Sequence, residues 1–228
     1  MKYHVEFDIE LRKNPYKGIY IAVEGIDGCG KTTQIESLKN YFKGKKKSVV
    51  VTSEPRKKGS PVGELIHKVL EGRIKIPSSS LQYLYTADRI INHASIVEPS
   101  LKKGKIVLSH RCLWSNLPYG MQDIGIVNYN SNDARVIDAA HGLLSLYHQF
   151  IIPDITFYLR VSIDTALKRL SKMKKAKEIY EKKEKLKKIA QGYEWLAKKF
   201  DKEIIVIDGE KSAEDVTGNI IKLLRLPK

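Results

Sequence analysis

The sequence predicts an α/β fold: one mostly parallel sheet of about five strands with helices on both faces, which makes a three-layer sandwich. Short, continuous apolar runs recur along the chain, and stretches with helical spacing lie between them. The length of 228 residues suits one domain, and no repeat or linker indicates a second. We therefore interpret residues 1–228 as a single domain.

All five continuous apolar runs of the chain predict strands, and the first and third are expected to be fully buried. They are residues 19–23 (IYIAV), 48–52 (SVVVT), 105–109 (KIVLS), 154–161 (DITFYLRV) and 203–207 (EIIVI). Residues 3–12 instead alternate apolar and polar side chains, which predicts a half-buried strand. We expect this N-terminal extension, residues 1–17, to lie at a sheet edge or to cover a subunit.

Helices are predicted in the segments between these strands. They are expected at about residues 31–42, 61–72, 79–98, 112–121 and 133–149, after Ser162, before residue 203, and at about 212–225. The signals over 112–121 and 133–149 are weaker than the others. Residues 172–188 are mostly lysine with interspersed glutamate, which indicates a solvated helix or a mobile flap.

Composition excludes several classes of protein. Hydrophobic residues make up 42% and charged residues 29%, a balance that argues against global disorder. No apolar run approaches the roughly 20 residues of a membrane span, and no apolar signal segment is present. We therefore expect a cytoplasmic protein with no membrane partner. Cys29 and Cys112 are too few and too far apart to predict a disulfide framework or a zinc cluster.

The net charge of +15 predicts attraction to polyanions. Nucleic acids and small phosphorylated ligands both fit this charge, so composition does not choose between them. The chain has no recognisable nucleic-acid-binding motif, and we do not expect a nucleic-acid partner.

Residues 25–32, GIDGCGKT, satisfy the phosphate-loop pattern G-x-x-x-x-G-K-[ST] between a buried strand and a helix. Glycines let successive backbone N–H groups approach phosphate oxygens at a helix N-terminus. Lys31 is expected to reach the β- and γ-phosphates, and Thr32 to give a hydroxyl to Mg²⁺. The residues expected to bind ATP are Gly25, Gly28, Cys29, Gly30, Lys31, Thr32 and Thr33.

Further segments carry a resemblance to the thymidylate kinases. In chain order they are VEGIDGCGKTTQ, SEPRKKGSPVGELI, LQYLYTADRIINH, SHRCLWSNLPYG, IPDITFYLRV, QGYEWLA and IIVIDG. The resemblance implies the P-loop NTPase fold, and the reaction of ATP with dTMP to give ADP and dTDP, with Mg²⁺, in dTTP biosynthesis. It also implies a homodimer.

The resemblance implies that Lys31, Arg111 and Asp27 are catalytic, with Arg111 gripping the acceptor phosphate. Tyr85 would stack on the thymine ring, and Arg89 would bind the base edge or the acceptor phosphate. Without the resemblance, Tyr85 could be an ordinary core aromatic. Arg89 could likewise form a surface ion pair with Asp88 or with another neighbour on the helix.

Other substrate contacts are implied in the same way. Ser115 and Asn116 would bind the pyrimidine face, although both residue types also favour helix caps and turns. Tyr119 would press on the sugar C2′, and core packing is the alternative. Asp27 would hold the 3′-hydroxyl or, with Thr32, belong to the metal shell. Glu54 would support the acceptor pocket.

The chain departs from the family pattern at several positions. His110 stands where the family usually has aspartate, Cys112 where it has an aromatic residue, and His67 where an arginine is common. His110 matters most, since imidazole is a poor ligand for Mg²⁺. The resembled family places a catalytic basic residue either in the phosphate loop or in a mobile lid. Positions 26–29 contain no basic residue, so the resemblance implies a catalytic cation in a lid at about residues 168–188. The candidates are Arg169, Lys172, Lys174, Lys175 and Lys177, and a solvated Lys/Glu surface is the alternative.

Three other functions stay open. His110 and Cys112 motivate a broad-specificity or dUMP-preferring nucleotide kinase. His110 also motivates a nucleotide-binding paralogue without turnover. The net charge of +15 motivates a basic nucleic-acid-binding protein.

Overall fold

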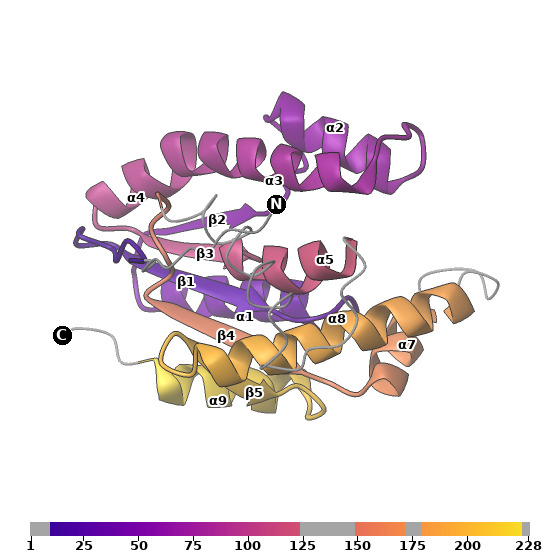
Figure 1. Ribbon diagram of the computed structural model, residues 1–228. Coiled ribbons are helices and arrows are strands. Elements are labelled where there is room, and N and C mark those ends of the chain that lie inside the picture. Colours follow the sequence, from indigo (N-terminus) through magenta and orange to yellow (C-terminus); the bar gives the residue numbers. More distant parts are fainter. Residues whose placement is uncertain (1–9, 124–148, 172–178, 225–228) are drawn as a thin grey trace.

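The computed structural model describes residues 10–123, 149–171 and 179–224, and its centre is a five-stranded parallel sheet (Figure 1). The strand order is β2-β3-β1-β4-β5. The strands are β1 (Ile19–Glu24), β2 (Val49–Ser53), β3 (Ile106–His110), β4 (Ile155–Arg160) and β5 (Ile204–Asp208). The five predicted strands and the predicted α/β class are confirmed.

The central strand β1 explains why the apolar runs do not alternate. It pairs with β3 on one side and β4 on the other, and its residues from Tyr20 to Glu24 are buried. Helices cover both faces of the sheet, so side chains that point either way lie in the core. Strand β1 therefore has both of its faces in the core, whereas the edge strands β2 and β5 are partly exposed, at Val51 and Val206.

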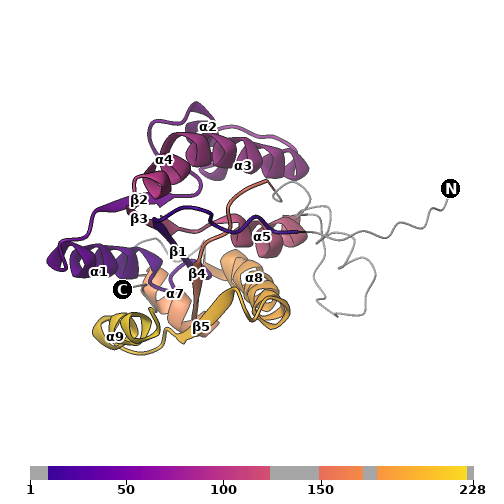
Figure 2. The same ribbon diagram turned by 90° about the vertical axis from the view of Figure 1, so that its left-hand side faces the viewer.

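The helices form layers on the two sides of the sheet and a group beyond its β2 edge (Figure 2). The helices are α1 (Lys31–Gly44), α2 (Pro61–Leu70), α3 (Ser78–Asn92), α4 (Glu98–Lys102), α5 (Asn116–Asp123), α7 (Ile163–Ser171), α8 (Ile179–Lys199) and α9 (Ala213–Leu223). Figure 2 shows α1 and α9 on one face, α5 and α8 on the other, and α2, α3 and α4 above β2.

Two predicted helices differ in detail from the observed ones. The helix predicted over 79–98 continues from α3 through a π-helical stretch, His93–Val97, into α4. The helix predicted over 112–121 begins as a 3₁₀ turn, Leu113–Ser115, and continues as α5. Helix α2 begins as its sequence predicts, with Pro61 in the first turn and the Ser60 hydroxyl accepting from Gly63 N at 3.1 Å.

Some predictions fall mainly outside the described residues. The strand predicted over 3–12 lies there up to residue 9, and Arg12 forms an isolated parallel bridge with Ile151. The helix predicted over 133–149 and lid positions 172–178 also lie outside, except for residue 149. Among the helices that the structure describes, none is long and apolar enough to cross a membrane.

The sheet topology brings two loops together. Val23 pairs with His110 in the register of β1 and β3, so the segments that follow these strands begin at the same edge. In open α/β sheets, ligands bind outside the carboxyl ends of the strands. Phosphate-loop residues 25–30 and Arg111 both follow at this edge.

Candidate functional site

The phosphate loop between β1 and α1 has the backbone conformation that its glycines predict. Gly25, Gly28 and Gly30 have φ values of +136°, +84° and +105°, which L side chains rarely adopt. A Cβ at Gly28 would lie 2.5 Å from the backbone oxygen of Ala166, so α7 packs directly against the loop. The loop therefore needs glycine both for its conformation and for this close contact.

The first residues of α1 present the groups that the motif predicts. Lys31 is 4% exposed, and its Nζ donates to the carbonyl oxygens of Gly25 at 2.8 Å and Ile26 at 2.9 Å. Burial lowers the pKa of Lys31, and the nearby Arg111 cation adds to the effect. Thr32 and Thr33 are exposed at the helix N-terminus, where a phosphate group is favourable.

Arg111 follows β3 and reaches across to the phosphate loop. Its backbone N donates to Val23 O at 3.0 Å, which fixes it beside β1. Its Nη2 donates to Asp27 Oδ1 at 2.7 Å and to Tyr119 OH at 2.6 Å, with Cζ 4.7 Å from the Tyr119 ring centroid. Partial burial would raise the pKa of Asp27, but Arg111 and Lys31 outweigh it and hold this pKa below its usual range. Three predicted site residues therefore meet here.

Glu24 and Tyr193, to which the sequence assigned no role, belong to the same cluster. Arg111 Nη1 donates to the hydroxyls of Ser115 at 3.2 Å and Tyr193 at 3.0 Å. Both hydroxyls donate in turn to Glu24 Oε2, at 2.6 Å and 2.7 Å, and Cys112 N donates to Glu24 Oε1 at 2.8 Å. The sequence signal for Glu24 was a lone acid ending an apolar buried strand directly before the phosphate loop.

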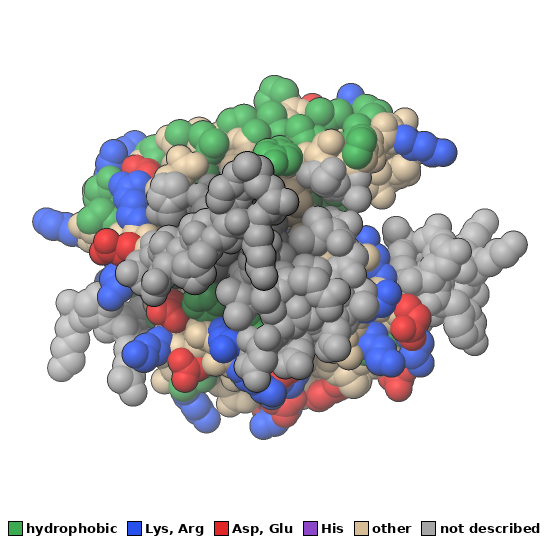
Figure 3. All heavy atoms as spheres, viewed as in Figure 1, with side chains coloured by type: hydrophobic (Ala, Val, Ile, Leu, Met, Phe, Trp, Pro, Cys, Tyr) green, Lys and Arg blue, Asp and Glu red, His purple; other side chains and the backbone are tan. Residues whose placement is uncertain are grey.

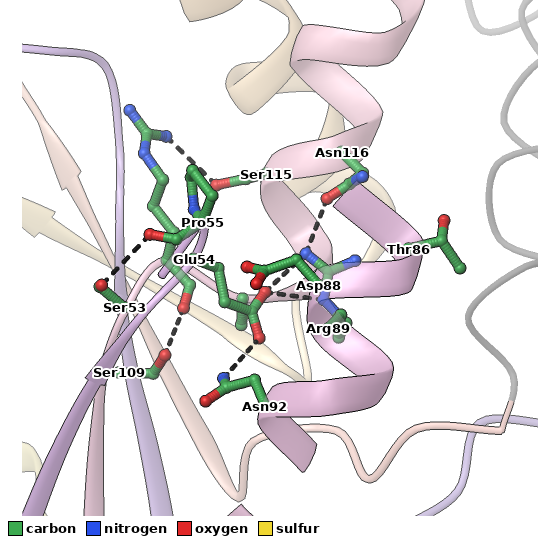
Figure 4. Close-up of polar contacts among 12 residues, drawn as sticks. Ser53, Glu54, Pro55, Thr86, Asp88, Arg89, Asn92, Ser109, Ser115 and Asn116 are labelled. Atoms are coloured by element: carbon green, nitrogen blue, oxygen red, sulfur yellow. Dashed lines mark hydrogen bonds and ion pairs between the residues drawn. The ribbon is translucent and has the colours of Figure 1, made fainter. Parts of the chain in front are cut away.

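A second cluster joins the end of β2 to α3 (Figure 4). Arg89 Nε donates to Glu54 Oε2 at 2.7 Å, and Asn92 Nδ2 donates to Glu54 Oε1 at 3.3 Å. Arg89 Nη2 donates to Asn116 Oδ1 at 2.8 Å. Burial raises the pKa of Glu54, although the Arg89 guanidinium opposes this shift. Glu54, Arg89 and Asn116, all predicted for the acceptor pocket, therefore lie together.

The alternative of a surface ion pair between Arg89 and Asp88 is wrong. Arg89 is 2% exposed and pairs with Glu54 instead. The Asp88 carboxylate accepts from Ser60 Oγ at 2.5 Å and from Arg56 N at 2.9 Å. It therefore holds the β2–α2 connection in place.

Tyr85, predicted to stack on the base, and His110, which departs from the family pattern, lie on α3 and at the end of β3. Tyr85 lies one turn before Arg89 on α3 and is partly buried, so both residues belong to one face of the helix. His110 is the last residue of β3. Burial, with Lys31 and Arg111 nearby, lowers the pKa of His110 to about 3, so its imidazole is uncharged at neutral pH.

Arg169, the one lid candidate within the described residues, contacts the phosphate loop from α7. Its Nη1 donates to Cys29 O at 3.3 Å and its Nη2 to Gly209 O at 3.0 Å, in the turn after β5. The guanidinium thus bridges two loops at the carboxyl edge of the sheet. The other candidates, Lys172, Lys174, Lys175 and Lys177, lie outside the described residues.

Comparison with known proteins gives one consistent family. The family model described as thymidylate kinase matches residues 23–220. A probable thymidylate kinase of Methanocaldococcus jannaschii is 37% identical over 208 residues, which cover 91% of this chain and 96% of the relative. Thymidylate kinases of Sulfurihydrogenibium sp. and Thermoanaerobacter sp. are 33% and 30% identical, with 91% and 92% of this chain and 97% and 98% of the relatives covered.

Proposed function

Because the chain belongs to the thymidylate kinase family and is an ATP:dTMP phosphotransferase, we propose that the two clusters at the carboxyl edge of the sheet perform this reaction. ATP binds along the phosphate loop, and dTMP binds between Arg111 and the Glu54–Arg89 cluster. The reaction gives ADP and dTDP, the precursor of dTTP.

One observation carries this assignment of the site. Arg111 N donates to Val23 O at 3.0 Å, only two residues before Gly25. The Arg111 guanidinium, a group that binds phosphate well, therefore begins directly beside the loop that is suited to the donor phosphates. In-line transfer needs the two phosphate groups at this close spacing.

The acceptor pocket follows from the second cluster. We assign Tyr85 to stacking on the thymine ring, and Arg89 and Asn116 to the polar edge of the base or the acceptor phosphate. Glu54 holds Arg89 in place. Tyr119, whose hydroxyl accepts from Arg111, borders the sugar.

Ser115 takes a different role from the one that the resemblance implied. Its side chain is 8% exposed, and its hydroxyl donates to Glu24 and accepts from Arg111. Both hydrogen-bonding functions are therefore engaged within the protein. We assign Ser115 to holding Arg111 rather than to contacting the base.

Phosphoryl transfer here depends on position and charge. An oxygen of the acceptor phosphate attacks the γ-phosphorus of ATP while the bond from that phosphorus to the β–γ bridging oxygen breaks and ADP leaves. No strong general base is needed because the acceptor phosphate is already a dianion near neutral pH. Lys31 neutralises charge on the β- and γ-phosphates, and Arg111 holds the attacking group. Asp27, ionised beside both cations, is assigned to the acceptor 3′-hydroxyl or the metal shell.

The donor set fits Mg²⁺ when the phosphates are counted. In the described parts of the chain, no group of three or more His, Cys, Asp or Glu residues could hold a metal ion by itself. Mg²⁺ prefers oxygen ligands and keeps several waters and phosphate oxygens, so the Thr32 hydroxyl and the Asp27 carboxylate suffice as protein ligands. The uncharged His110 is assigned no bond to it. Mg²⁺ would neutralise charge on the transferring phosphates.

The homodimer and the cytoplasmic location complete the proposal. Figure 3 shows hydrophobic side chains gathered over α2 and α3. On these two helices, Leu70, Tyr83 and Ile90 are 54%, 67% and 47% exposed. Because exposed apolar patches mark interaction sites, we assign this face to the partner subunit. A cytoplasmic location fits a reaction that consumes ATP.

A steady-state panel of dTMP, dUMP, dGMP, dCMP and UMP with ATP and Mg²⁺ tests the assignment. The expected result is the highest kcat/KM for dTMP. Comparable values across the panel would support a broad-specificity kinase instead. ATP binding without ADP release would support a silent paralogue, and salt-dependent DNA binding at physiological ionic strength would support a nucleic-acid-binding protein.

A further inference from the structure

Glu24 is a buried carboxylate at the carboxyl end of the central strand β1. It ends β1, is 1% exposed, and follows a run of buried apolar residues. Burying a carboxylate is costly unless hydrogen bonds and opposite charge compensate for the lost water. The contacts that compensate Glu24 all lead to the residues around Arg111.

The two carboxylate oxygens of Glu24 have different partners. Oε1 accepts from Cys112 N at 2.8 Å, the residue directly after Arg111. Oε2 accepts from Ser115 Oγ at 2.6 Å and Tyr193 OH at 2.7 Å, and lies 3.9 Å from Arg111 Nη1. The carboxylate therefore faces the guanidinium with two hydroxyls between them.

The charge on Glu24 sets the direction of these two hydroxyls. Ser115 Oγ and Tyr193 OH are 3.0 Å apart, farther than either is from Oε2, so each gives its single hydrogen to the carboxylate. Their lone pairs then face Arg111 Nη1, which donates to both. A neutral amide at position 24 would offer its own N–H to one hydroxyl and reverse that direction.

Arg111 needs this support because of its backbone. Its φ of +73° lies in the left-handed region that non-glycine residues rarely adopt. Glu24 accepts a hydrogen bond from the next backbone N–H, that of Cys112. It also accepts from Tyr193 OH, which connects it to α8. The Tyr193 ring stacks on Tyr158 of β4, with centroids 5.1 Å apart and planes at 13°. The support therefore comes from β1, β4 and α8 together.

We propose that Glu24 is a positioning residue for the acceptor phosphate: it orients the Arg111 guanidinium through the Ser115 and Tyr193 hydroxyls. The inference rests on the proposed role of Arg111 in binding that phosphate. It assigns no contact between Glu24 and the nucleoside. The base pocket is held separately, by Glu54 and Arg89.

The test compares dTMP with thymidine, which lacks the phosphate. Calorimetry measures the Kd of Glu24→Gln for dTMP, thymidine and ATP. Steady-state kinetics measures its kcat/KM for dTMP. We expect Kd for dTMP to rise about tenfold and kcat/KM to fall about 10- to 100-fold, with thymidine and ATP affinities unchanged. The matched control is Glu98→Gln, which alters a carboxylate that binds Arg12 and Tyr16 outside the site.

A purely structural role for Glu24 gives a different pattern. Equal loss of dTMP and thymidine affinity in Glu24→Gln, or no loss of either, overturns the inference. If Glu24→Gln does not fold, Tyr193→Phe removes one of the two hydroxyl links. It should then weaken dTMP more than thymidine, and equal effects overturn the inference.

The wild-type protein separates this inference from the proposed function. If wild-type protein binds thymidine as tightly as dTMP, the role of Arg111 itself is wrong. If the wild type prefers dTMP and Glu24→Gln keeps the same preference, the role of Arg111 stands and only the role of Glu24 is wrong.

Discussion

Glu54 and Arg89 form a buried ion pair across 35 residues of sequence, with Nε 2.7 Å from Oε2 and side chains 5% and 2% exposed. The pair joins the end of β2 to the last turn of α3. It also orients Arg89 toward Asn116, so one contact both stabilises the fold and shapes the acceptor pocket.

Removing one partner of this pair should destabilise the protein strongly. Arg89→Met leaves the Glu54 carboxylate buried without its cation, and we expect a loss of about 3–5 kcal/mol in the free energy of unfolding. Denaturant unfolding at neutral pH measures it. The double variant Glu54→Gln/Arg89→Met should recover much of the loss. Arg73→Met, which breaks an exposed pair with Glu71, is the control and should have little effect. Additive losses in the double variant would contradict the coupling.

Arg169 should act on the ATP side of the reaction. Its guanidinium contacts the phosphate loop at Cys29 O, so Arg169→Ala should lower kcat/KM for ATP by about 10- to 100-fold without changing the Kd for dTMP. The control is Lys168→Ala, which removes an exposed cation from the neighbouring position of α7. Equal effects of the two substitutions would show that charge alone, and not the contact of Arg169, matters.

His93 should make stability depend on pH below neutrality. Burial, with Arg89 and Arg12 nearby, lowers the pKa of His93 from 6.5 to about 3. Below pH 6.5 the His93 imidazole is protonated in the unfolded chain but stays neutral in the folded protein. Acid therefore favours unfolding. The stability that neutral His93 provides is complete above pH 6.5 and decreases toward pH 3, by about 1.4 kcal/mol per pH unit.

His93→Phe removes this titration and keeps a ring beside Phe150 and Tyr20. Between pH 6 and pH 4, the free energy of unfolding should fall by about 2–3 kcal/mol less in the variant than in the wild type. Parallel pH profiles for the two proteins would contradict a neutral, buried His93.

The fold was predictable because its strands appear as continuous apolar runs. The inner strands β1, β3 and β4 are mostly buried, whereas Val51 and Val206 on the edge strands β2 and β5 are 39% and 37% exposed. The phosphate loop was predictable from local sequence, since its glycines, Lys31 and Thr32 lie within eight residues. The hydrogen bond from Tyr193 to Glu24 spans 169 residues, and no local pattern indicates it. The buried partner of Arg89 was missed for the same reason: Asp88 is adjacent in sequence, whereas Glu54 is adjacent only after α3 packs beside β2.

The exposed face of α2 and α3 should form the dimer interface. Tyr83 and Ile90 lie seven residues apart on one side of α3, so Tyr83→Arg/Ile90→Glu should convert a dimer into a monomer in sedimentation velocity. Leu223→Glu, at an exposed apolar position of α9, is the control and should leave the dimer intact. A monomeric wild type, or a double variant that stays dimeric, would rule out this face.

Transfer of labelled γ-phosphate from ATP to dTMP by the purified full chain, with Mg²⁺, tests the central claim most directly. The wild type should release ADP and labelled dTDP in equal amounts. Lys31→Ala should lower the rate at least about 100-fold with the fold intact, and Lys39→Ala, on the same helix, should not. Wild-type protein that forms no labelled dTDP, or a Lys31→Ala variant that keeps a near-wild-type rate, would contradict the assignment.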